Sequence, residues 1–263
     1  MNQTIPADYT GHEMETLQLA AQLIMENGGE TYRAEETVRR MGEGFGLRQV
    51  ESFAVPSGLF ISYRTPEDQL VTSVKRVHNR RTDLTVVNGV NQVSREASAG
   101  RLSSREALMR LRSLEDLSAK SSPVSALAAA ICAAGFVFLF QGNWQDSLVS
   151  AAVAAIVQGT SLLLARIHDP GIASTILGGL LTAFLPALCI RWVPGLNGEA
   201  IVAGALMPLV PGLAMTNAVQ DTLRGDMVSG LSHGVSALLT ACLIAGGALL
   251  SPALIRLMSG GGL

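Results

Sequence analysis

The chain has 263 residues, of which 48% are hydrophobic and 15% are charged, and its formal net charge is −2. The charges are unevenly distributed, because residues 1 to 121 hold 15 of the 19 Lys and Arg and 16 of the 21 Asp and Glu. This pattern predicts a soluble domain over residues 1–121 and a membrane domain over residues 122–263, and the weak net charge of both argues against nucleic-acid binding.

The N-terminus carries neither a basic region nor an apolar core of the kind found in secretory signals, so we expect the first domain to stay in the cytoplasm. Cys132, Cys189 and Cys242 lie far apart in apolar runs without metal-ligand spacing. They are interpreted as packing residues, and neither a metal site nor a cofactor is predicted.

The first domain is predicted to be α+β. Apolar residues recur at helical spacing over about 11–27 and again from Ala34 to Phe45, which indicates a helical hairpin. Short alternating runs follow at 50–55, 59–63 and 69–74, separated by turn residues, and they predict a three-stranded antiparallel meander. Helical spacing returns over 86–97, and Ser103 with Glu106 has the capping-box spacing that begins a further helix.

The second domain is predicted to be all-α, with about five membrane spans. They are placed near residues 124–141, 147–165, 172–190, 199–219 and 227–255. Trp144 and Trp192 fall at predicted outer ends, where interfacial aromatic residues are common.

The fourth predicted span is interrupted by Pro208, Pro211 and Gly212. Proline removes a backbone donor and glycine weakens a helix, and freed carbonyls in lipid need a protein or water partner. The interruption therefore predicts either a substrate-handling cavity or a kink that only shapes the bundle.

Asn217 and Asp221 follow the interruption four residues apart, so they share one helix face with Arg224. Ionisable groups at membrane helices are costly unless they are used, which makes Asp221 a candidate for a proton or cation site or for part of an inner gate. A solvated helix end is the alternative.

An enzyme is not predicted. Residues 230–234 match the G-x-S-x-G pattern of hydrolases, but they open a long apolar span and not the strand-turn-helix that the pattern requires. They are interpreted as a small-residue packing face. No phosphate-binding loop is present in the sequence either.

Two polar clusters stand out in the first domain. Gly28, Gly29, Glu30 and Arg33 lie at the predicted hairpin tip, and a basic cluster of Lys75, Arg76, His78, Arg80 and Arg81 follows the third strand. They are consistent with a solvated surface or with a face for anion recognition or gating, and their spacing does not decide between the two.

Four motifs resemble the threonine/serine exporter family in its split form, in which this chain corresponds to the larger subunit. They are NGGET at 27–31, VES at 50–52, TSVKRVHNR at 72–80 and LVPGLAMTNAVQDTLRGDMVSGLSH at 209–233. The last is the most specific, and the resemblance covers most of the chain.

The resemblance implies a cytoplasmic domain, about five spans and a smaller all-helical membrane subunit as partner. It also implies importance for Gly29, Glu30, Arg76, Pro211, Gly212, Asn217, Asp221 and Gly225. At His233 the family pattern carries arginine, so a contact to an anionic substrate group would be weaker or pH-dependent here.

The resulting prediction is an exporter subunit of the bacterial inner membrane, a secondary transporter that works as a hetero- or homo-oligomer in the lipid bilayer. Threonine and serine are the first expected substrates; dicarboxylates such as succinate, or a regulatory subunit whose partner conducts, are the alternatives. The candidate binding or coupling residues are Pro208, Pro211, Gly212, Thr216, Asn217, Asp221 and His233. The candidate gating residues are Gly29, Glu30, Arg33 and Arg76.

Overall fold

The structure is a computed structural model, and it describes residues 11–78, 81–118, 124–165 and 171–258. Contacts group the chain into two compact units. The first unit comprises residues 1–120 together with 213–235, and the second comprises residues 121–212 and 236–263. The domain boundary at residue 121 therefore stays a prediction. Residues 213–235, from late in the chain, pack with the N-terminal residues in the first unit.

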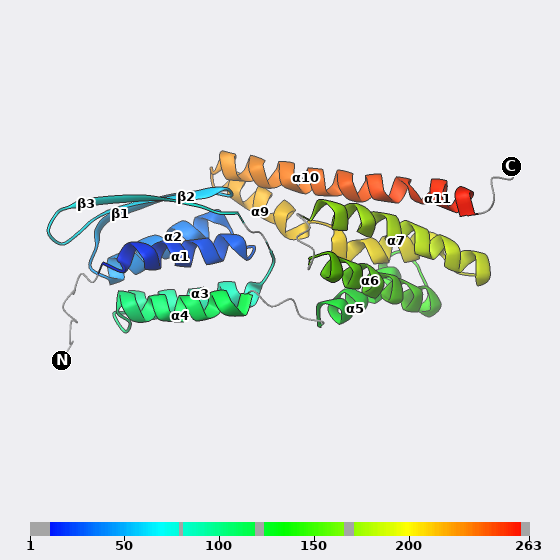
Figure 1. Cartoon of the computed structure of the whole chain (residues 1–263), viewed down its shortest axis with the longest axis horizontal. Helices are drawn as coiled ribbons and strands as arrows, with labels where there is room; N and C mark the ends of the chain where they lie inside the picture. Colours follow the sequence, from blue (N-terminus) through cyan, green and yellow to red (C-terminus); the bar gives the residue numbers. More distant parts are fainter. Residues whose placement is uncertain (1–10, 79–80, 119–123, 166–170, 259–263) are drawn as a thin grey trace. The chain divides into compact units, whose positions relative to one another are not determined.

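The first unit contains four N-terminal helices and three strands. The helices are α1 (Glu13–Glu26), α2 (Thr31–Gly44), α3 (Leu84–Ser98) and α4 (Ser104–Ser118), and the strands are β1 (Arg48–Val55), β2 (Gly58–Arg64) and β3 (Leu70–Arg76). The sheet has the order β1-β2-β3 with both pairs antiparallel, so the predicted meander is confirmed. Figure 1 shows the sheet on one side of the α1–α2 hairpin and the α3–α4 pair on the other.

The core of this unit lies around α1, whose apolar residues face both neighbouring layers. Leu17 and Ile24 of α1, Val38 of α2 and Val90 of α3 are fully buried, and Leu59 of β2 closes the core from the sheet side. α4 begins with the predicted capping box, in which Ser103 N and Oγ donate to Glu106 Oε2 at 2.9 and 2.8 Å.

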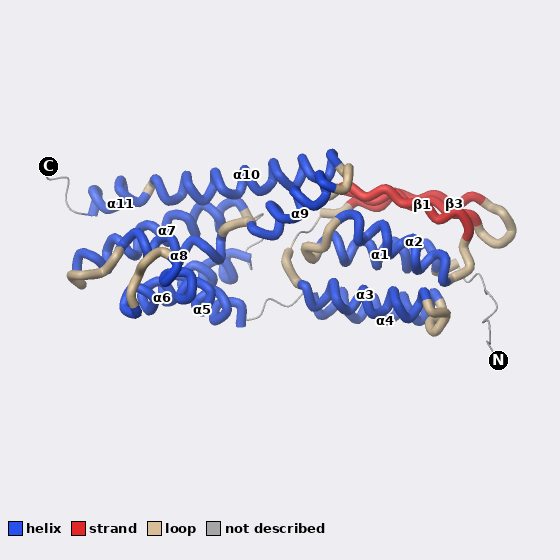
Figure 2. Tube along the Cα trace, turned by 180° about the vertical axis from the view of Figure 1, so that it is seen from behind, coloured by secondary structure: helices blue, strands red, loops and turns tan. Residues whose placement is uncertain are grey.

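The second unit is an all-helical bundle, as predicted. It contains α5 (Val124–Leu139), α6 (Trp144–Ala165), α7 (Ile172–Trp192), α8 (Gly198–Leu206) and the short 3-10 turn η1 (Met207–Leu209). It also contains α10 (Met227–Leu249) from Ser236 onward and α11 (Ser251–Met258). Figure 2 gives the same helices from behind, in blue.

Glycines set the close contact between α7 and α10. A Cβ atom on Gly179 would collide with the Ile244 carbonyl oxygen, and one on Gly247 would collide with the Ile176 carbonyl oxygen. The two backbones therefore approach at both positions, in the manner of small-residue packing between membrane helices.

Three described helices are long and apolar enough to cross a membrane: Trp144–Ala165, Ile172–Trp192 and Met227–Leu257. The pair Gly198–Leu209 and Gly212–Leu223 makes a fourth if it is counted as one interrupted span. α5 is apolar but has only 16 residues, so three to four candidate spans are supported and the count of five stays a prediction.

Candidate functional site

The interruption predicted in the fourth span is confirmed. α8 ends at Leu206, the 3-10 turn η1 holds Pro208, and α9 (Gly212–Leu223) begins directly after Pro211. Val210 adopts an extended conformation between them, with φ −62° and ψ 129°. The extended residue precedes a proline, which disfavours the helical conformation at the position before it.

α9 holds Asn217 and Asp221 on one face, as their spacing predicted, and both are buried in the first unit. The Asn217 amide nitrogen donates to the Gly28 carbonyl oxygen at 3.3 Å. Gly28 lies in the loop between α1 and α2 with φ +89°, a conformation that glycine adopts without strain. The neighbouring Gly29 has no room for a side chain, because a Cβ atom there would collide with Ile24.

The Asp221 carboxylate is fully buried, and neither of its oxygens has a hydrogen-bond partner among the described residues. His233 Nε2 of α10 lies 3.7 Å from Asp221 Oδ2, which becomes an ion pair when the imidazole is protonated. The Thr31 hydroxyl at the start of α2 is also buried and lies close enough to the carboxylate to interact with it, although this contact does not meet the geometry of a hydrogen bond. A buried carboxylate with so few partners is costly unless it binds a proton, a cation or a ligand.

A tight turn brings the beginning of α10 back along α9. Gly225 has φ +93°, and Asp226 N donates to the Asp221 carbonyl oxygen at 2.9 Å. Gly230 then lies so close to α9 that an added Cβ atom would collide with the Thr222 hydroxyl and would lie 3.0 Å from the Ala218 carbonyl oxygen. The glycines of this segment thereby place His233 next to Asp221.

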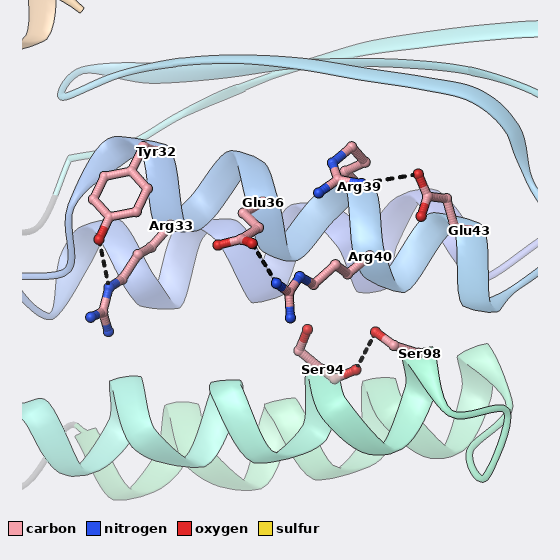
Figure 3. Close-up of polar contacts among 8 residues, drawn as sticks. All are labelled: Tyr32, Arg33, Glu36, Arg39, Arg40, Glu43, Ser94 and Ser98. Atoms are coloured by element: carbon pink, nitrogen blue, oxygen red, sulfur yellow. Dashed lines mark hydrogen bonds and ion pairs between the residues drawn. The ribbon is translucent and has the colours of Figure 1, made fainter. Parts of the chain in front are cut away.

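Aromatic and charged residues of α2 border this site. The guanidinium of Arg224 lies over the Tyr32 ring, 3.4 Å from its centre, in a cation–π contact. Arg33 Nε lies 3.0 Å from Glu30 Oε2. The same nitrogen donates to the Tyr32 hydroxyl at 3.3 Å, a contact that Figure 3 shows. The Tyr32 hydroxyl and the Glu30 carboxylate raise the pKa of Arg33, against the opposing effect of its partial burial.

The structure brings together some of the predicted site residues. Asn217 contacts the loop that holds Gly29 and Glu30, and His233 lies next to Asp221. Arg33 lies beside that loop and pairs with Glu30. Thr216 is exposed on α9, and Pro208, Pro211 and Gly212 form the interruption in the second unit.

The basic cluster after β3 is not part of this group. Arg76 is exposed at the end of β3, and within the described ranges no hydrogen bond or ion pair links it to Asn217 or Asp221. Arg80 of the same cluster lies outside the described residues.

Thr31, Tyr32 and the Gly28 carbonyl were not predicted as contacts of α9. The sequence feature that could have identified two of them is the family motif NGGET, which contains Gly28 and Thr31. The contact of Tyr32 could not be predicted from the sequence, because a single aromatic residue on an amphipathic helix is common and does not indicate a binding site.

The structure also bears on the hydrolase pattern, on metal binding and on the cysteines. Ser232 of the G-x-S-x-G pattern lies inside α10, where no sharp strand-to-helix turn is present. In the described parts of the chain no group of three or more His, Cys, Asp or Glu is arranged to hold a metal ion. All three cysteines are free thiols.

Comparison with known proteins gives a family match over most of the chain. The family model described as "Putative threonine/serine exporter" matches residues 15–255. No solved structure matches the chain.

Similar proteins carry two kinds of name. "Probable succinate transporter subunit YjjP" of Escherichia coli (strain K12) is 24% identical over 82% of this chain and 85% of its own length. "Probable threonine/serine exporter" of Mycobacterium tuberculosis (strain ATCC 25618 / H37Rv) is 22% identical over 86% of this chain and 43% of its own. "Threonine/serine exporter" of Corynebacterium glutamicum is 24% identical over 92% of this chain and 52% of its own.

The chain thus spans about half the length of the two relatives named threonine/serine exporters and most of the length of the succinate transporter subunit. With a family model that covers residues 15–255, and with apolar helices long enough to cross a membrane, the chain belongs to the threonine/serine exporter family of membrane transporters.

Proposed function

We propose that this chain is the larger subunit of a secondary exporter of small polar metabolites, with threonine and serine as its first substrates. The subunit resides in the bacterial inner membrane with its N-terminal domain in the cytoplasm, and it assembles with a smaller all-helical membrane subunit. The family match and the name of a relative as a transporter subunit support this proposal.

The observation that carries the proposal is the Asp221 carboxylate. It is fully buried, its oxygens lack hydrogen bonds among the described residues, and it lies on α9, the helix that follows the interruption. Such a group fits a site whose occupancy changes during a transport cycle, because the free-energy cost of the unoccupied state is relieved when an ion or substrate binds.

In this mechanism the interruption at Pro208–Gly212 supplies backbone groups for the substrate, and Asn217 and Asp221 form the coupling site or inner gate. His233 is next to Asp221, so its protonation strengthens the contact with the carboxylate and changes the charge of the site.

The test is efflux from cells that express this chain with its smaller partner subunit and are loaded with a threonine-containing dipeptide. Asp221→Asn is expected to abolish threonine efflux, because the amide cannot take the negative charge of the carboxylate. Asp226→Asn in the adjacent turn is the matched control and is expected to retain efflux. Both proteins must be present in the membrane in equal amounts, and normal efflux from Asp221→Asn would contradict the coupling role.

A dicarboxylate exporter is the second candidate, favoured by the relative named as a succinate transporter subunit. Counterflow in proteoliposomes with threonine, serine, succinate and malate separates the two. We expect exchange of threonine and serine, because this chain has His233 where the family pattern implies an arginine, and an imidazole binds a dianion less strongly than the permanently charged guanidinium does.

A further inference from the structure

An open cleft of about 600 Å³ lies in the first unit between α2, β1 and the end of α9. Four residues of α2 line it at helical spacing, namely Tyr32, Glu35, Glu36 and Arg39. Glu51 and Ser52 of β1 form the opposite wall, and Arg224 contributes from the turn after α9. The volume falls within the range of small-molecule sites, but almost all of the lining side chains are polar or charged.

The cleft follows the free edge of the sheet, because β1 is an outer strand. At one end of this edge both backbone groups of Ala54 already have partners. Its N–H donates to Glu35 Oε1 at 2.7 Å, and its carbonyl oxygen accepts from Ser229 Oγ of α10 at 3.3 Å. Since backbone groups of an antiparallel strand alternate between its two sides, those of Ser52 face the same free edge.

The charged groups of the cleft differ in whether they have partners. Glu36 pairs with Arg40 at 2.6 Å and Arg39 pairs with Glu43 at 3.3 Å, each within α2 (Figure 3). Burial raises the pKa of Glu35, the Ala54 N–H bond opposes this shift, and the carboxylates of Asp226 and Asp221 add to it. Glu51, by contrast, is exposed and has no ion pair or hydrogen bond to another described side chain.

Arg224 is the matching free cation. Its guanidinium lies over the Tyr32 ring, and none of the carboxylates in the described ranges comes within ion-pair distance of it. A guanidinium stacked on an aromatic ring keeps its edge donors available for a carboxylate. One free carboxylate and one free guanidinium therefore line the same cleft.

We propose that this cleft is a binding site for a small zwitterion of the α-amino acid class, with its ammonium group at Glu51 and its carboxylate at Arg224. The wall holds three carboxylates and two guanidiniums, so a dianion would meet more negative than positive charge. A simple cation would leave the guanidinium of Arg224 without a partner. The site is separate from the Asp221 carboxylate, and the proposal does not require the chain to transport anything.

Ligand binding at this cleft would be linked to the end of α9. Arg224 follows Asp221 by three residues, and its backbone N–H donates to the Asp221 carbonyl oxygen at 3.2 Å. A ligand that holds Arg224 against α2 thus stabilises the arrangement in which Asp221 is buried, and by linkage this arrangement of α9 binds the ligand more tightly than one in which α9 has moved away from α2.

The experiment is isothermal titration calorimetry on the purified full chain in detergent, with L-threonine as the probe. Two analogues each lack one charge: 3-hydroxybutyrate has no ammonium group, and 1-amino-2-propanol has no carboxylate. We expect threonine to bind and each analogue to bind about tenfold or more weakly, because each loses one charge-assisted hydrogen bond. Equal affinity for either analogue, or for succinate, would overturn the zwitterion assignment.

Variants separate this site from the transport site. Glu51→Gln is expected to weaken threonine binding about tenfold or more, whereas Glu67→Gln, at an exposed position in the turn before β3, is expected to leave it unchanged. Asp221→Asn is expected to retain binding. Loss of binding in Asp221→Asn with full binding in Glu51→Gln would assign the threonine to the transport site and refute the cleft. Absence of binding to the wild type up to about 10 mM threonine, where even a millimolar site is occupied, would refute it as well.

Discussion

Asp146 and Asp221 are both fully buried aspartates of the apolar half of the chain, but their surroundings differ. Asp146 accepts backbone N–H groups of Asn143 and Asn197, each at 2.8 Å, so it ties the start of α6 to the loop before α8. Asp221 has no hydrogen bond of this kind. The hydrogen bonds of Asp146 explain its burial by a structural role, whereas no such bonds explain the burial of Asp221, for which we propose the coupling role.

The Asn217 amide is the contact that joins α9 to the Gly28 loop, and it can be tested by truncation. Asn217→Ala removes the donor and leaves the Gly28 carbonyl without it, at a cost of about 1–3 kcal/mol. We expect the melting temperature of the purified chain to fall by about 2–4 °C for each kcal/mol. Asn88→Ala, at an exposed position on α3, is the control, and an equal melting temperature for both variants would argue against the contact.

The sequence predicted that Asn217 and Asp221 share a helix face, because helical spacing depends only on local positions. It did not predict that Asn217 contacts Gly28, which lies 189 residues earlier in the chain. A contact between residues so far apart in the sequence depends on how the whole unit folds, and the spacing of apolar residues along the chain does not indicate it. The family resemblance drew attention to both segments without indicating that they touch.

At the level of elements, the parts with strong local signals were predicted well. The strand pattern and the turn residues at Pro56–Gly58 predicted the hairpin of β1 and β2, which the register confirms with Val55 opposite Gly58. The helix interruption at Pro208–Pro211 was predicted for the same reason, since proline acts on its own neighbours. The ends of the membrane helices were less predictable. The turn between α5 and α6, for example, is limited by hydrogen bonds between Asn143 and Asp146, which the hydrophobic pattern does not show.

The capping box of α4 should make part of the stability of the chain dependent on pH. Hydrogen bonds from Ser103, first from its backbone N–H and then from its hydroxyl, lower the pKa of Glu106. A lowered pKa in the folded state means that the contribution is present above the pKa of the unfolded chain and is lost as pH falls through the folded value. We expect Glu106→Gln to lower the melting temperature at neutral pH and to have progressively less effect as the pH falls below about 4. A difference from wild type that stays constant from pH 7 to pH 3 would contradict this.

The glycine contact between α7 and α10 offers a test on two adjacent residues. Gly247→Ala places a methyl group against the Ile176 carbonyl, so we expect the helices to separate at a cost of about 1–3 kcal/mol. Gly246→Ala meets no atom within 4 Å, and it should be neutral or stabilising by up to about 1 kcal/mol because alanine favours the helix. Equal melting temperatures for the two purified variants would mean that this contact is not tight.

At the scale of the whole molecule, the described residues contain three to four candidate spans, which are few for a complete transport path. We therefore expect efflux only when the chain is produced together with the smaller membrane subunit that we propose as its partner. Threonine efflux should be measured in cells that contain each subunit alone and both together. Efflux from the partner alone would show that it conducts by itself and would favour the regulatory role for this chain.

The first unit is built from two stretches of chain, residues 1–120 and 213–235, which are separated by 92 residues of the second unit. During synthesis the N-terminal helices and strands emerge first, but Asn217 and Ser229 reach Gly28 and Ala54 only after α5 to α8 have been made. Closing so long a loop is slow compared with local folding. The last step of folding in this unit is therefore expected to follow the membrane insertion of the intervening helices, so that a chain with misplaced helices leaves its N-terminal domain incomplete.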